Sequence, residues 1–133
     1  MDVPKAIKQK ISGLREYQLA RMYVGPLLDA LILEFTRCSE GADVTVELSQ
    51  IAHIQVSKTL DDEDGCYLVH EANIERVTDG GTSVLTSLGY RIRDEDGSVF
   101  SYPSQSMYHL HLEGDVCIEV VCGHYQVYEA VKE

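Results

Sequence analysis

Apolar and polar side chains alternate one by one along much of this chain. The alternation is clearest in two neighbouring stretches, which carry Leu31, Leu33 and Phe35 and then Val44, Val46 and Leu48. Residues two apart on a β-strand share a face, so this period predicts strands with one buried and one exposed face. The loop 37–43 between the two stretches is short enough to join antiparallel neighbours. The pattern therefore predicts a β-hairpin and favours a sheet over a helical fold.

Three further hairpins are expected on the same grounds. The second pairs Ile54 and Val56 with residues 66–69, the third pairs residues 89–93 with 98–102, and the fourth pairs residues 108–112 with 116–121. The tetrapeptide Asp-Glu-Asp-Gly stands in the second and third connections, at 62–65 and 94–97. Asp-Gly is favoured where a hairpin turn needs a positive φ, so both copies predict turns.

Two N-terminal segments and one internal segment complete the expected elements. Residues 4–11 begin with proline and place Ile7 and Ile11 one helical turn apart, which predicts a short amphipathic helix. Its apolar face is too small for stable attachment to a membrane surface, so we expect it to dock on the sheet. Residues 17–24 suit either a helix or a strand, and we choose a strand that ends at Gly25-Pro26. A short helix is expected over residues 83–88.

The expected fold class is α+β, with a twisted antiparallel sheet and a short N-terminal helix. The pattern leaves open whether the sheet forms a sandwich or a half-barrel. With 133 residues, the chain matches the ~100–200 residues of one ordinary domain, so residues 1–133 are expected to form a single domain.

The net charge of the chain limits the classes of binding partner that are expected. The net charge is −11, which disfavours nucleic acid and anionic membranes. Residues 1–37 contain six basic and four acidic side chains, or +2, whereas residues 38–133 contain five basic and eighteen acidic ones, or −13. High charge serves solubility, and it also suits a basic protein partner. The first residues lack the apolar stretch of a signal peptide, so we expect a cytoplasmic protein with reduced thiols.

The fourth hairpin contains the candidate metal site. If its turn has an odd number of residues, Leu110, Leu112, Ile118 and Val120 share the buried face. The opposite face then gathers His109, His111, Cys117 and Glu119, with His111 opposite Cys117 and His109 opposite Glu119. Imidazole, thiolate and carboxylate groups at cross-strand distance can share a transition metal. The same face needs only water and a His–Glu pair if no metal binds.

The sequence gives little support for other metal sites or for catalytic motifs. The four cysteines contain no C-x-x-C pair. Asp62, Asp64, Gly65 and Glu71 fit part of a calcium-binding EF-hand loop, but its first position would be Leu60. We find no nucleophile motif and no phosphate-binding loop, so no cofactor is expected and the sequence leaves the catalytic residues unknown.

Three segments resemble the latter half of a group of small bacterial domains of unknown function. They are Ser83-Val84-Leu85-Thr86-Ser87-Leu88-Gly89, the run Leu110-His111-Leu112-Glu113-Gly114-Asp115-Val116-Cys117-Ile118-Glu119-Val120, and Tyr128-Glu129-Ala130. The resemblance covers about a third of the chain and implies a small β-rich fold without a known active site.

Two functions are compatible with these features. The first is a small acidic interaction protein of the cytoplasm, of the immunity type that neutralises a basic toxin. The alternative is a small hydrolase or metal-dependent enzyme that uses His109, His111, Cys117 and Glu119. The lack of a catalytic motif favours the first. Residues 125–131 are β-prone and weakly charged, which predicts an edge strand through which the chain forms a homodimer.

Overall fold

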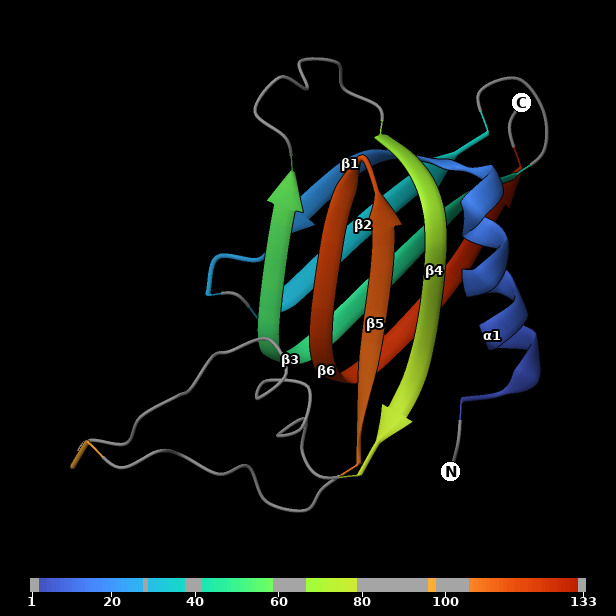
Figure 1. Ribbon diagram of the computed structural model, residues 1–133. Helices are drawn as coiled ribbons and strands as arrows, with labels where there is room; N and C mark the ends of the chain where they lie inside the picture. The colour runs from blue at the N-terminus through green and yellow to red at the C-terminus, as the bar shows by residue number, and fades with distance from the viewer. Residues whose placement is uncertain are drawn as a thin grey trace.

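The computed structural model describes residues 3–27, 29–37, 42–58, 67–78, 96–97 and 106–131. They contain the helix α1 (Lys5–Ser12), the 3-10 helix η1 (Gly13–Glu16) and the strands β1 (Gln18–Val24), β2 (Ala30–Thr36), β3 (Ala42–Lys58), β4 (Tyr67–Val77), β5 (Met107–Gly114) and β6 (Val116–Val131). The strands form a closed antiparallel barrel in the order β1-β2-β3-β6-β5-β4 (Figure 1). The α+β fold with an N-terminal helix is confirmed, and the closure that the sequence left open is a barrel.

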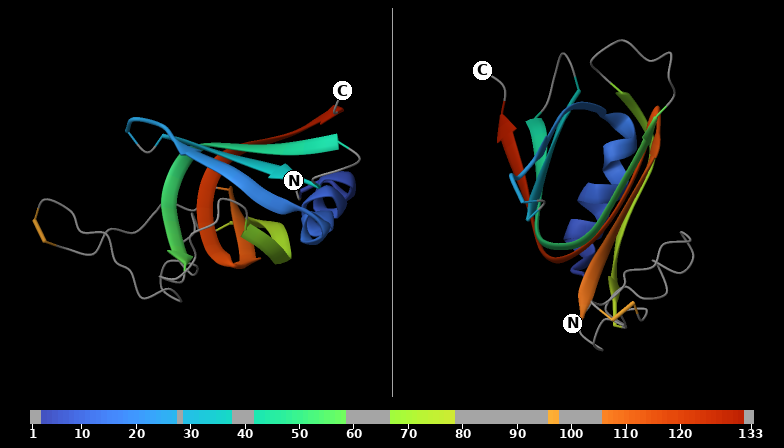
Figure 2. Two further views of the ribbon diagram at one scale, coloured as in Figure 1. Left: turned by 90° about the horizontal axis from the view of Figure 1, so that it is seen from above. Right: turned by 90° about the vertical axis from the view of Figure 1, so that its left-hand side faces the viewer.

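Two long strands bend and pass from one side of the barrel to the other (Figure 2). β3 pairs with β2 as far as Ser49, and the pairing of β5 with β6 ends at Cys122. At this bend Gln50 has a φ of 55°, and the β3–β6 register shifts between Ile51 and His53. A Cβ atom on Gly123 would lie 2.4 Å from Gln50 Oε1, so a residue without a side chain allows the close approach here.

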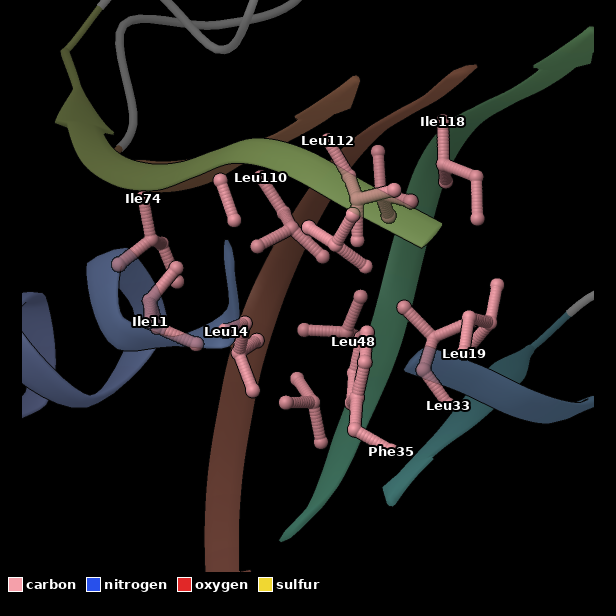
Figure 3. Packing of buried hydrophobic residues seen from close by; sticks show 14 of the residues in the cluster. Ile11, Leu14, Leu19, Leu33, Phe35, Leu48, Ile74, Leu110, Leu112 and Ile118 are labelled. Carbon is pink, nitrogen blue, oxygen red and sulfur yellow. The ribbon is translucent and has the colours of Figure 1, made fainter. Parts of the chain in front are cut away.

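The core lies between the two sides of the bent barrel and under α1 (Figure 3). Leu33 and Leu48 contribute from one side, and Leu110 and Ile118 contribute from the other. The remaining opening is filled by Ile11 of α1, which is fully buried. The helix begins after Pro4 and its lysines lie on exposed positions, so the predicted docking of its apolar face on the sheet is confirmed.

Several strand predictions hold, and one is wrong. The strand after Tyr17 and the hairpin of β2 with β3 are confirmed. The second hairpin is not formed, because β3 continues to Lys58 and pairs with β6 along its whole length. β4 pairs with β5, and its first residues pair with β1. Alternation marked these strands correctly, but it carries no information about which strand lies beside which.

The third hairpin and the helix expected at 83–88 lie outside the described residues, as does the loop 61–65. Of the second Asp-Glu-Asp-Gly, Asp96 and Gly97 are described and form a turn in which Gly97 has a φ of 87°. No helix in the described part of the chain is long and apolar enough to cross a membrane.

Candidate functional site

One outward-facing surface of the barrel gathers polar side chains from four adjacent strands, and we call it the outer face. Its polar positions alternate with core residues and are His53, Gln55 and Ser57 on β3, Glu71, Asn73 and Glu75 on β4, His109, His111 and Glu113 on β5, and Cys117 and Glu119 on β6. None of these positions holds lysine or arginine. Carboxylates and imidazoles therefore face one another without a permanent cation among them.

The fourth hairpin forms, with a register two residues away from the expected one. Leu112 pairs with Ile118 and His111 pairs with Glu119, whereas the sequence predicted His111 opposite Cys117. A shift of two residues keeps every side chain on its face. The predicted burial of Leu110, Leu112, Ile118 and Val120 is therefore confirmed.

The shift arises because β4 binds the residues that were expected to form the turn. The Asp115 N–H donates to the Leu68 carbonyl at 3.0 Å, and Asp115 Oδ2 accepts from the Leu68 N–H at 2.9 Å. Gly114 lies so close to β4 that a Cβ atom would be 2.1 Å from the Leu68 carbonyl oxygen. The ends of β5 and β6 therefore separate, since one pairs with β4 and the other with β3.

Glu119 lies between two histidines at the centre of the outer face. Its Oε2 accepts a hydrogen bond from His109 Nε2, and its Oε1 accepts one from His111 Nδ1. The side chains are only 16% exposed for Glu119, 21% for His109 and 24% for His111. Partial burial weakens competition from water, so this group is held more firmly than a surface ion pair.

His111 contacts carboxylates through both ring nitrogens. Its Nε2 lies 3.1 Å from Glu113 Oε1, while its Nδ1 faces Glu119. Burial opposes the charged imidazole, but the hydrogen bond from Glu119 and the charges of Glu119 and Glu113 outweigh it and raise the pKa of His111. This ring therefore keeps its proton to a higher pH than a free imidazole does.

Two side chains of β3 border the same group, and sequence reasoning did not find them. His53 pairs with Val121, the residue that also pairs with His109, and burial lowers the pKa of His53. Gln55 pairs with Glu119, and its Oε1 is buried without a hydrogen-bond partner within the described part of the chain. The alternation of Ile54 and Val56 put both residues on the opposite face of the strand, but the sequence predicted a hairpin with residues 66–69 and gave no sign that this part of β3 pairs with β6.

Three of the four predicted ligands come together. One ligand atom each from His109, His111 and Glu119 lie within 4.8 Å of one another, and Glu71, His111 and Glu113 form a second such group. Cys117 is exposed and belongs to neither group. A tetrahedral zinc ion, with bonds of about 2.0–2.1 Å, holds its ligand atoms ~3.3 Å apart. The first group can reach that spacing by small rotations of side chains that already converge.

Comparison of the chain with models of protein families finds no match, and comparison with curated proteins finds none either.

Proposed function

We propose that this protein binds a divalent transition-metal ion through His109, His111 and Glu119. The observation that carries the proposal is the convergence of two imidazoles and one carboxylate on adjacent strands, within 4.8 Å and partly buried. Imidazole nitrogen and carboxylate oxygen form a donor set that suits zinc and its neighbours better than calcium or magnesium. Gln55 adds support, because it pairs with Glu119 in the β3–β6 ladder and its Oε1 is buried without a hydrogen-bond partner among the described residues, so a polar ligand there would satisfy it.

Three protein ligands leave a coordination position for water or for a group on another molecule. Zinc held by these three residues would act as a Lewis acid and would lower the pKa of a bound water toward neutrality. This chemistry supports the metal-dependent hydrolase that the sequence offered as its alternative function. Cys117 is left out of the proposed ligand set, since the two-residue shift places it away from both histidines.

Isothermal titration with Zn²⁺ tests this proposal on protein purified without a histidine tag and stripped with a chelator. We expect one ion per chain, with binding reduced at least ~100-fold in His109→Ala and Glu119→Gln, since each variant removes one of three ligands. Cys117→Ser and His70→Ala are the matched controls and should bind as the unchanged protein does. Binding that is absent, or that depends on Cys117 and not on Glu119, contradicts the proposal.

A second candidate function follows from the charge of the outer face. We infer that Glu71, Glu75 and Glu113 attract a basic protein partner, because among the described residues of the outer face these exposed carboxylates have no lysine or arginine beside them. Such a surface accelerates association with a cationic protein and makes it sensitive to salt. The immunity-type role and a cytoplasmic location belong to this proposal, together with a homodimer formed through the C-terminal part of β6.

A decalysine peptide provides a defined probe for this second function. The triple variant E71Q/E75Q/E113Q should bind it at least ~10-fold more weakly in ~50 mM salt than E16Q/E34Q/E47Q, which changes the net charge equally at positions off the outer face. Equal losses in both triple variants would mean that net charge alone attracts the peptide. That result would remove the outer face as the docking surface.

A further inference from the structure

The second group of converging ligand atoms adjoins the first group on the outer face. It consists of Glu71 on β4 and of His111 and Glu113 on β5, two strands that lie side by side (Figure 1). One ligand atom from each of these residues lies within 4.8 Å of the other two. The two groups share His111 and no other residue, so this side chain connects them.

The two nitrogens of the His111 ring face different groups. Nδ1 contacts Glu119 of the first group, and Nε2 lies 3.1 Å from Glu113 Oε1 of the second group. Either ring nitrogen can bind a metal ion, so one imidazole has a ligand atom for an ion on each side. The 3.1 Å separation is close to the ~3.3 Å between neighbouring ligand atoms around tetrahedral zinc. The His111–Glu113 side of the second group therefore needs little rearrangement.

The register of β4 and β5 places two carboxylates against each other. Glu71 pairs directly with Glu113 in the ladder, although like charges at opposite positions destabilise a sheet. Among the described lysines and arginines, none forms an ion pair with either carboxylate. Arg15 lines a hollow together with Glu71 but makes no ion pair with it. A divalent cation between the two carboxylates would remove their repulsion.

We propose that Glu71, Glu113 and Nε2 of His111 bind a second zinc ion, and that the His111 ring bridges it to the first. This inference rests on the proposed function, because Nδ1 of the same ring would bind the first ion. Formation of the bridge releases the Nε2 proton to solvent and leaves an imidazolate between two cations. With Zn–N bonds of about 2.0–2.1 Å on both sides of the ring, the ions would lie ~6 Å apart.

This spacing defines what the second ion does. Two ions that act together on one reacting group lie ~3.5–4 Å apart, which is shorter than a bridge through an imidazole allows. The second ion would instead fix the orientation of His111 and add positive charge beside the first ion. It is therefore a supporting ion, and the open coordination position of the first ion stays the place for a substrate.

The second ion should bind more weakly than the first. The Glu113 side chain is 52% exposed and Glu71 is exposed too, whereas Glu119 is only 16% exposed. Exposed side chains lose more freedom when they are fixed, and the second ion must also displace a proton. We expect it to need ~100-fold more free zinc, so a titration at low zinc registers one ion per chain.

Equilibrium dialysis of the full chain against buffered free zinc, followed by elemental analysis, tests the proposal. We expect one ion per chain at low zinc and two at high zinc. Glu71→Gln and Glu113→Gln should each weaken the second ion at least ~10-fold and leave the first within about twofold. Both variants remove a repulsion, so they should fold. Glu75→Gln is the matched control, because it removes an exposed carboxylate of β4 opposite His109 that lies outside the second group.

Proton release distinguishes the bridge from an ion held by carboxylates alone. Titration calorimetry of the second ion at about pH 7.5, in two buffers of different ionisation enthalpy, gives the number of protons released. A bridge releases about one proton from His111, whereas an ion on Glu71 and Glu113 alone releases none. Release of no proton would overturn the proposal.

Two further outcomes would also overturn it, and one of them leaves the proposed function intact. A first ion that binds without a second, or a second ion that Glu75→Gln weakens as much as Glu71→Gln does, contradicts the bridged site alone. Absence of the first ion from the unchanged protein contradicts the proposed function and the bridge together.

Discussion

At the scale of single residues, the two described cysteines differ in burial, so we expect one thiol to be reactive and the other to be protected. Cys122 points into the core and is fully buried, and burial raises the pKa of its thiol to about 12. The thiolate, which is the reactive form, is therefore scarce below about pH 10. Cys117 is exposed on the outer face.

We predict that iodoacetamide at pH 8 modifies Cys117 within minutes and leaves Cys122 unmodified in the folded protein. Cleavage after Glu119 separates the two residues, and mass spectrometry then gives the modified fraction of each. In urea both should react. Equal modification of the two thiols without denaturant would contradict the burial of Cys122.

Among the described glycines, Gly114 has the closest backbone contact for an added Cβ atom. Because a Cβ atom there would meet the Leu68 backbone at 2.1 Å, Gly114→Ala forces β5 away from β4 and should cost about 2–4 kcal/mol. Gly13→Ala is the matched control, since no atom lies within 4 Å of its added Cβ, and it should be neutral or stabilise the protein by up to about 1 kcal/mol. Urea unfolding followed by circular dichroism measures both values. Similar stabilities for the two variants would refute the close contact.

At the scale of elements, the local pattern identified most strands and could not identify their partners. The alternation in β2 and β5 was strong enough to assign faces, and α1 followed from Pro4 and the spacing of Ile7 and Ile11, whereas η1 was not predicted. The partner of β3 beyond Ser49 is β6, which lies far away in sequence, and no local signal specifies such a pairing. The same limit explains the site, because His53 and Gln55 join it only through that long-range ladder.

The contribution of α1 to stability can be measured at one buried position. Ile11 is fully buried against the strands, so Ile11→Ala should destabilise the protein by about 2–4 kcal/mol through lost burial and a residual cavity. Lys8→Ala on the exposed side of the same helix should change stability by less than about 0.5 kcal/mol. Thermal unfolding followed by calorimetry gives the comparison. A small effect at Ile11 would mean that the barrel holds together without the helix.

At the scale of the whole molecule, closure of the barrel still leaves the C-terminal segment of β6 with a single neighbour among the described strands. Residues 124–131 of β6 pair with β3, and the pairing with β5 ends at Cys122 in the described part of the chain. Lys10 Nζ lies 3.7 Å from Glu129 Oε1, so the only charged side chain among residues 125–131 is partly neutralised. This segment is therefore an edge strand, and the homodimer predicted from the sequence depends on such an edge.

We predict a homodimer at ~10–50 µM, measured by light scattering with size-exclusion chromatography. Val127→Pro removes a backbone donor and distorts this edge, but it can also damage the β3 ladder. Tyr128→Lys is the gentler variant, because Tyr128 is 46% exposed and a lysine there would place like charges across a two-fold axis. A monomeric mass for the unchanged protein excludes the dimer directly.

The bend at Gln50 and Gly123 has a consequence for cooperativity. Because β3 and β6 are continuous through it, each side of the barrel is built partly from the same two strands. Neither side can open while the other keeps its full set of hydrogen bonds, so the molecule lacks a natural division into independently unfolding units. Amide protons on both halves of β3 should then exchange with solvent through one global opening. A destabilising substitution on one side of the bend should therefore lower protection against hydrogen exchange equally on both sides.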